Sequence, residues 1–191
     1  MRARIEGKAG AVLAMARAFE FSTQKHKAQK RKGADQEPYV NHLAEVARLV
    51  AEATGGRNLP LVLAALLHDT LEDTDTTRGE LRREFGPQVA RLVAEVTVDK
   101  TLPKPAQKMS EERHAHRLSR GAKILKIADK TSNLRSVAIS PPVTWSTSRR
   151  RDYVAFTERV VSGCRGVSPQ LEAAFAGAQR AARRSFRTAR S

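Results

Sequence analysis

The segment Leu59–Asp73, with the sequence LPLVLAALLHDTLED, decides the fold class of this chain. Asn58 can cap a helix that begins here, and Pro60 lies in its first turn, where proline is tolerated. The first nine side chains are apolar on every face of that helix, and a helix of this kind must be buried nearly all round. The segment therefore predicts a central buried helix that turns polar at His68.

The other periodic segments of the chain are also helical. Apolar residues recur in them at three- and four-residue intervals, which is the repeat of one helix face. These segments are residues 9–30, 40–54, 77–85, 86–96, 121–139, 146–163 and 168–178. Residues 99–107 carry Pro103 and Pro105 and are expected to form a loop. Strand-like alternation is missing and aromatic residues make up only 5% of the chain, so the sequence predicts an all-α bundle.

The composition is that of a single folded domain from a reducing compartment. A length of 191 residues supports one hydrophobic core that does not need disulfide bonds or a structural metal ion. The single cysteine, Cys164, excludes a disulfide framework and a cysteine-based zinc site. No apolar run approaches the roughly 18–20 residues that span a bilayer, and the first ten residues lack the apolar region of a secretory signal. We expect a cytoplasmic protein with no membrane partner.

The net charge of +15 is concentrated at the two ends of the chain. Residues 1–32 hold nine basic residues against two acidic ones, and residues 179–191 hold five arginines and no acid. We expect residues 1–178 to form the domain and residues 179–191 to form a basic, disordered tail. Terminal charge of this kind can bind nucleic acid, although a solvated tail is commoner. A basic cavity mouth would also attract a small anionic substrate.

The candidate functional residues directly follow the apolar run. His68 and Asp69 are followed by Glu72 and Asp73, at spacings that place all four groups on neighbouring positions of one helix face. Three carboxylates beside a buried helix repel one another and lose hydration, at a cost on the order of several kcal/mol unless a cation compensates them. A divalent metal ion would do so. The alternative is an exposed acidic helix end that continues into Asp75.

Two residues from other segments extend this cluster. His42, in PYVNH, opens an amphipathic helix, and Asp129, in KILKIADKTSNLRSV, follows a run of apolar positions. Taken alone, the histidine could cap its helix and the aspartate could pair with a neighbouring basic residue. Together with His68 and Asp69 they supply two imidazoles and two carboxylates, a ligand set that suits Mn²⁺, Fe²⁺ or Zn²⁺.

Four stretches of this sequence resemble the small alarmone hydrolases, the Mesh-type relatives of the hydrolase half of Rel/SpoT proteins in the HD-domain superfamily. The stretches are KHKAQKRKGADQEPYVNH, AALLHDTLEDTDTT, EVTVDKTLPK and ILKIADKTSNLRSV. Their order and spacing match over residues 9–178, and a helix with Trp145 and Tyr153 follows them. The resemblance implies an HD-domain helical bundle whose central buried helix carries the His-Asp motif. The chain departs from the family at its arginine-rich end and at Thr131 and Ser132, in a variable part of the last stretch.

The resemblance also implies a role for individual residues. The family's four manganese ligands correspond to His42, His68, Asp69 and Asp129. Its catalytic acidic pair corresponds to Glu72 and Asp73. Its substrate contacts correspond to Arg31, Lys32 and Asn133, with Lys104, Arg149 and Tyr153 as further phosphate or ribose contacts. On composition alone, Arg31 and Lys32 could equally belong to a solvated basic stretch, and His26 is expected at the surface or at the substrate rim.

The implied reaction is the Mn²⁺-dependent hydrolysis of guanosine 3′,5′-bis(diphosphate), (p)ppGpp, to GDP and pyrophosphate. The same site could act on adenosine alarmones of the (p)ppApp type or on NADPH, because base selection depends on a few pocket contacts. A non-enzymatic alternative is a sensor that binds alarmone, or a module that binds nucleic acid, without turnover. The complete set of ligands and acidic residues favours the enzyme, with a small nucleotide as its partner. The sequence does not determine the oligomeric state.

Overall fold

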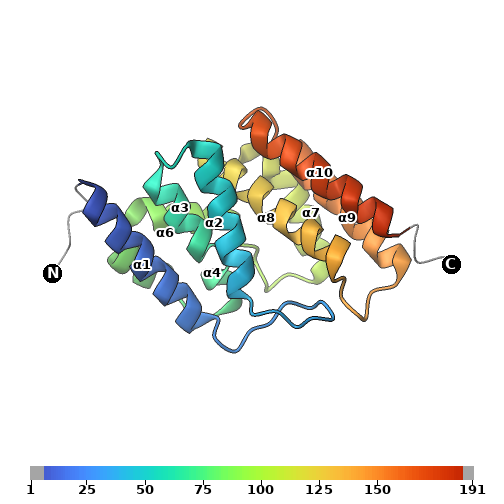
Figure 1. Ribbon diagram of the computed structural model, residues 1–191, viewed down its shortest axis with the longest axis horizontal. Coiled ribbons are helices and arrows are strands. Elements are labelled where there is room, and N and C mark those ends of the chain that lie inside the picture. Colours follow the sequence, from blue (N-terminus) through green and yellow to red (C-terminus); the bar gives the residue numbers. More distant parts are fainter. Residues whose placement is uncertain (1–6, 187–191) are drawn as a thin grey trace.

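The computed structural model describes residues 7–186, which form α-helices joined by short loops (Figure 1). The first helices are α1 (Gly7–Lys25), α2 (Val40–Thr54), α3 (Leu59–Leu67), α4 (Thr70–Asp73), α5 (Arg78–Phe85) and α6 (Pro87–Val96). They are followed by α7 (Lys104–His114), the 3-10 turn η1 (Ala115–Arg117), α8 (Arg120–Ile139), α9 (Thr147–Ser162) and α10 (Pro169–Ser185). Within residues 7–186 the only extended pairing is two isolated β-bridges, so the predicted all-α class is confirmed.

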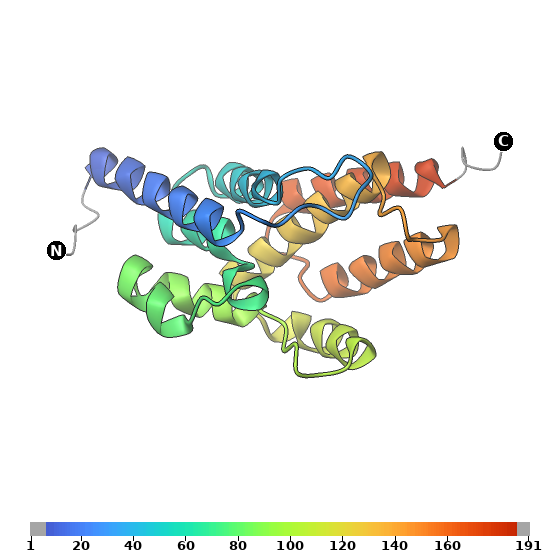
Figure 2. The same cartoon turned by 90° about the horizontal axis from the view of Figure 1, so that it is seen from below.

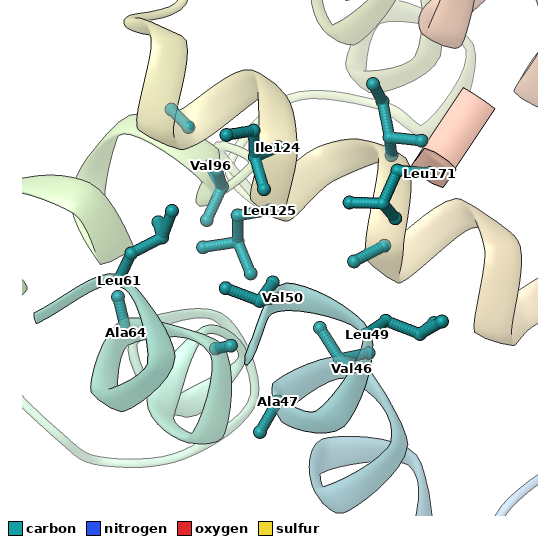
Figure 3. Close-up of a cluster of buried hydrophobic side chains, with 14 of the residues drawn as sticks. Val46, Ala47, Leu49, Val50, Leu61, Ala64, Val96, Ile124, Leu125 and Leu171 are labelled. Atoms are coloured by element: carbon teal, nitrogen blue, oxygen red, sulfur yellow. The ribbon is translucent and has the colours of Figure 1, made fainter. Parts of the chain in front are cut away.

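Helix α3 lies at the centre of the bundle, as its apolar sequence predicts. It packs against α1, α2, α6 and α8, and every side chain from Leu61 to Leu67 is buried. Figure 3 shows Leu61 facing Leu125 of α8 and lying close to Val96 of α6. On the other side of α8, α10 packs along its length. The core therefore holds the last turn of α3 and the middle of α8 in fixed positions relative to each other.

The predicted helix 59–73 is interrupted at His68 and Asp69. α3 ends at Leu67, and the polypeptide restarts as the single turn α4 at Thr70. Side chains satisfy the carbonyl groups that the break leaves open: His68 Nδ1 contacts the oxygen of Ala65 at 2.9 Å, and the Thr70 hydroxyl donates to the oxygen of Leu67. The break turns the acidic residues that follow away from the axis of α3.

The predicted helix 9–30 is wrong beyond Lys25, where α1 ends. Residues 26–39 form a loop instead, closed on itself by a bridge between Lys30 and Pro38. Figures 1 and 2 show this loop running from α1 across the molecule toward the end of α8. Gly33 makes the approach possible, because a Cβ atom there would collide with the backbone oxygen of Ser140. The loop thereby brings the segment that contains Arg31 and Lys32 to α8.

The chain forms helix in two places where the sequence predicts none. Residues 104–107, expected in a loop, begin α7: Pro103 occupies the N-cap position, and Pro105 lies in the first turn, where its missing N–H is not needed. The predicted tail from residue 179 is also helical as far as Ser185, and Ala182 and Phe186 are buried. These small and aromatic residues face the core while the arginines face outward. The remaining tail residues, 187–191, lie outside the described part of the chain.

The molecule is elongated, with α1 at one end and the C-terminal end of α10 at the other (Figure 2). No helix among residues 7–186 is long and apolar enough to cross a membrane.

Leu61 tests the central position of α3. This side chain is 1% exposed, so Leu61→Ala removes buried methyl groups and leaves a cavity that the packed neighbours cannot fill. We expect the free energy of unfolding in urea to fall by about 2–5 kcal/mol. The matched control is Leu13→Ala in α1, where the side chain is 51% exposed, and the expected change is within about 0.5 kcal/mol. Equal losses in the two variants would contradict a core built around α3.

Candidate functional site

Two imidazoles and two carboxylates meet where α2, the end of α3 and α8 converge. His42 Nε2 lies 3.6 Å from Asp69 Oδ2 and 3.4 Å from Asp129 Oδ1. His68 Nε2 lies 3.1 Å and 3.8 Å from the same two oxygens. The ligand atoms of His42, His68 and Asp69 all lie within 4.8 Å of one another. The structure thus brings together the four residues that the sequence proposes as metal ligands.

The bonding of the two histidines fits a metal site. Each Nδ1 atom is engaged, His42 with the Ser132 hydroxyl at 2.9 Å and His68 with the carbonyl of Ala65. Each Nε2 atom is buried and, among the described residues, makes no hydrogen bond. A buried nitrogen without a partner is costly, and an imidazole whose other nitrogen is held by a hydrogen bond is the usual form of a metal-ligating histidine. Paired with two carboxylates, these atoms can hold a divalent cation.

Charge in this cluster is far from balanced without a cation. Burial alone would lower the pKa of His68, but the carboxylates of Asp69 and Asp129 outweigh it and raise that pKa to about 10. Burial would raise the pKa values of Asp69 and Asp129, yet the facing imidazoles, with Lys130 beside Asp129, hold both well below the usual range. The two carboxylates are therefore ionised and attract whatever positive charge is available.

Tyr39 orients Asp69 from the loop that follows α1. Its hydroxyl donates to Asp69 Oδ2 at 2.6 Å, and burial together with the charge of Asp69 raises the pKa of Tyr39 above its usual value. The ring stacks on His26, with 5.2 Å between centroids. His26 is 2% exposed, so its predicted place at the surface is wrong; the loop folds back over it because Tyr39 N bonds to Gln29 O.

Glu72 and Asp73 lie on the single turn α4, beside the histidine cluster. Glu72 Oε2 accepts a hydrogen bond from the backbone N–H of Val98, and burial and the charge of Asp69 raise the pKa of Glu72. Asp73 pairs with Lys100, and its backbone oxygen accepts a hydrogen bond from Gln29. The two neighbouring acids therefore have different surroundings: Glu72 is held by a backbone N–H with Lys100 3.9 Å away, whereas Asp73 pairs directly with Lys100.

A cavity of about 280 Å³ joins these groups. It is lined by Lys32, Tyr39, His68, Asp69, Glu72, Asp73, Val96, Val98, Glu111, Leu125, Lys126, Asp129, Lys130, Asn133 and Tyr153. Five carboxylates face three lysines and His68, whose raised pKa keeps it protonated, so one negative charge on the wall is left unmatched. An anionic molecule would be repelled by such a wall unless a cation were bound there as well.

The predicted substrate residues divide into two groups. Lys32, Asn133 and Tyr153 line this cavity, and burial raises the pKa of Tyr153 to about 12, so its hydroxyl keeps the proton and can donate. Arg31 lines a second cavity, of about 190 Å³, and reaches the first through a hydrogen bond to Asn133 Oδ1.

The other two predicted contacts lie outside both cavities. Lys104 is exposed in the first turn of α7. Arg149 is exposed on α9, with its guanidinium 5.0 Å from the ring centroid of Trp145.

Sequence reasoning missed a buried ionic cluster on the cavity wall. Glu111 Oε1 of α7 lies 2.7 Å from Lys130 Nζ and 3.1 Å from Lys126 Nζ. Lys126 also donates to the backbone oxygen of Val96. The available signal was the pair of lysines at positions 126 and 130, which lie four residues apart in the otherwise apolar run of α8. The sequence does not identify their partner, because nothing in it predicts that Glu111 packs against α8.

Comparison with known proteins agrees with this geometry. The HD domain family matches residues 18–154. The guanosine-3′,5′-bis(diphosphate) 3′-pyrophosphohydrolase MESH1 of Mus musculus is 45% identical over 157 residues, covering 82% of this chain and 88% of the relative. The MESH1 protein of Homo sapiens matches with the same identity and coverage. This chain belongs to the HD-domain family.

A solved structure of "a metazoan ortholog of SpoT" that "hydrolyzes ppGpp" superposes on this HD-domain protein with a TM-score of 0.84. The two are 35% identical, and the match covers 87% of this chain and 94% of that one. The predicted resemblance to the small alarmone hydrolases is confirmed, and so is the helical bundle around a central helix. Membership of the HD-domain family also agrees with a divalent metal site at the histidine cluster.

Asp69 tests the metal site. Asp69→Ala removes a carboxylate that lies within 3.6 Å of both imidazoles. Loss of an outer-sphere partner weakens metal binding by about 10–100-fold, and we expect loss of this proposed ligand to weaken Mn²⁺ binding by more than that. Bound Mn²⁺ is measured by metal analysis after dialysis. The control is Asp75→Ala, an exposed acid six residues away that pairs with Lys25, and it should keep the metal. Full occupancy in the Asp69 variant would exclude this cluster as the ligand set.

Proposed function

We propose that this HD-domain protein is a Mn²⁺-dependent hydrolase of (p)ppGpp, which removes the 3′-diphosphate of guanosine 3′,5′-bis(diphosphate) to give GDP and pyrophosphate. The observation that carries the proposal is a single cavity in which a His-Asp metal cluster and the acidic pair Glu72–Asp73 face the same space. The MESH1 relatives, which are named for this reaction, support the choice of substrate.

The acidic pair can move the protons that hydrolysis requires. A bound divalent ion would supply Lewis-acid activation of water and would offset the negative wall of the cavity. Glu72, with its raised pKa, is suited to accept the proton of the attacking water and to return it to the departing 3′ oxygen. Asp73, paired with Lys100, is suited to orient the water while Glu72 takes the proton.

The positive side chains of the cavity can hold the two diphosphates. Lys32 comes from the loop after α1, and Lys126 and Lys130 come from α8. We assign the 5′-diphosphate to Lys32 with Arg31, and the 3′-diphosphate to the metal cluster. Asn133 and Tyr153 supply polar groups on the same wall and suit the ribose. Lys104 and Arg149, exposed on α7 and α9, would contact only the part of a nucleotide that projects from the cavity.

Turnover with and without metal tests the activity. Protein stripped by a chelator should be inactive, and Mn²⁺ should restore release of pyrophosphate from guanosine 3′,5′-bis(diphosphate), followed by chromatography of the products. The adenosine analogue and NADPH are offered in parallel. A preference for either would keep the site and change the substrate. Tight binding of all of them without product would contradict the enzyme and favour a sensor.

Glu72 tests the proton transfer. Glu72→Gln keeps the shape of the side chain but cannot accept a proton, so we expect kcat to fall by at least about 100-fold, the scale of a lost acid-base group. Mn²⁺ should stay bound, because the four proposed ligands are unchanged. The control is Glu52→Gln, an exposed residue of α2 that pairs with Arg48. If Glu72→Gln and Asp73→Asn both kept the wild-type rate, the acidic pair would have no catalytic role.

A further inference from the structure

The two histidines of the metal cluster are held from behind in different ways. His68 Nδ1 bonds to a backbone carbonyl of its own helix, so its orientation follows from the fold of α3. His42 Nδ1 instead contacts a side chain from another helix, the Ser132 hydroxyl of α8, at 2.9 Å. Ser132 is 1% exposed and lines the second cavity, beside His42, rather than the cavity that holds the acidic pair. The position of His42 therefore depends on a residue that is not among the four proposed metal ligands.

Ser132 is itself fixed by an ion pair. Its hydroxyl donates to Glu45 Oε2 at 2.6 Å, and Arg135 Nη1 donates to Glu45 Oε1 at 2.6 Å. His42 and Glu45 lie three residues apart on α2, and Ser132 and Arg135 lie three residues apart on α8, so each pair shares one helix face. The four side chains form one continuous chain of contacts between the two helices.

The direction of these hydrogen bonds determines the tautomer of His42. Burial would raise the pKa of Glu45, but the hydrogen bonds from Ser132 and Arg135 outweigh it and keep this pKa below its usual value. An ionised carboxylate only accepts, and a serine hydroxyl has a single proton, which is given to Glu45. Ser132 can therefore only accept from His42, so the Nδ1 atom carries the proton. With the proton on Nδ1, the Nε2 atom, 3.6 Å from Asp69 Oδ2 and 3.4 Å from Asp129 Oδ1, is the ring nitrogen that would bind a cation held by these carboxylates.

We propose that Ser132, Glu45 and Arg135 act as positioning residues that hold His42 with Nε2 presented to the divalent cation. The proposal rests on the metal site of the proposed function, but it does not depend on which nucleotide is hydrolysed. No other side chain among the described residues bonds to His42 Nδ1.

Mn²⁺ affinity of the folded protein tests the proposal without any turnover. Free Mn²⁺ is counted by its electron paramagnetic resonance signal during titration of the wild type, Ser132→Ala and the control Ser136→Ala, a serine one turn further along α8 that lines the second cavity. We expect Ser132→Ala to weaken binding by about 10–100-fold and Ser136→Ala to leave it unchanged. Ser132→Thr, which keeps the hydroxyl, should restore most of the affinity.

Two further measurements separate positioning from a general loss of structure. In protein loaded with diamagnetic Zn²⁺, the His42 Nδ1–H proton should give a slowly exchanging NMR signal in the wild type and lose it in Ser132→Ala. If Ser132→Ala fails to fold, Glu45→Ala serves instead: Glu45 is only half-buried, and its loss frees the Ser132 proton and should also weaken Mn²⁺ binding.

Equal Mn²⁺ affinity in the wild type and Ser132→Ala, or an equal loss in Ser136→Ala, would overturn the positioning role even if (p)ppGpp is hydrolysed. Conversely, a protein that shows the expected affinities but turns over no nucleotide would refute the proposed activity and leave the positioning chain intact. A wild-type protein that binds no Mn²⁺ would overturn both.

Discussion

The excess of negative charge inside the cavity is the constraint on which the rest of this structure depends. Five carboxylates share a wall with three lysines and His68, and Asp69 and Asp129 lie on its more buried side, where charge interactions are strong. A buried, ionised carboxylate is stable only when a cation or hydrogen-bond donors interact with it. Most of the polar contacts around the site serve this purpose, from the Tyr39 hydroxyl on Asp69 to the Lys130 ammonium on Asp129.

The apolar core fixes the relative positions of the charged groups in the cavity. α3 and α8 are buried almost throughout, and the polar groups appear where α3 breaks and where α8 faces the cavity. Because a packed core cannot shift by more than small amounts, the His68–Asp69 break and Asp129 keep a fixed separation. The ligand atoms are thus preorganised before any ion arrives, and the energy of ion binding is not spent on rearranging helices.

Much of this site could be predicted from the sequence, because its ligands lie next to strong helical signals. The apolar run before His68 and the run before Asp129 each identify a buried helix whose first polar residue must face something polar. What escaped prediction was set by contacts across the fold. His26 looked like part of a basic surface segment, yet the loop folds over it, and prolines that suggested a loop instead begin α7.

By itself, the sequence determined the all-α class and the central helix, since these follow from local periodicity, and it proposed the metal ligands from residue chemistry together with the family resemblance. Only the tertiary structure decided which side chains meet behind the site: Glu111 with Lys130, and Ser132 with His42 and Glu45. The physical reason is that a hydrogen bond or an ion pair depends on distances of about 3 Å. Distances this short between residues 19 to 90 positions apart are set by how whole helices pack, which no local pattern in the chain encodes.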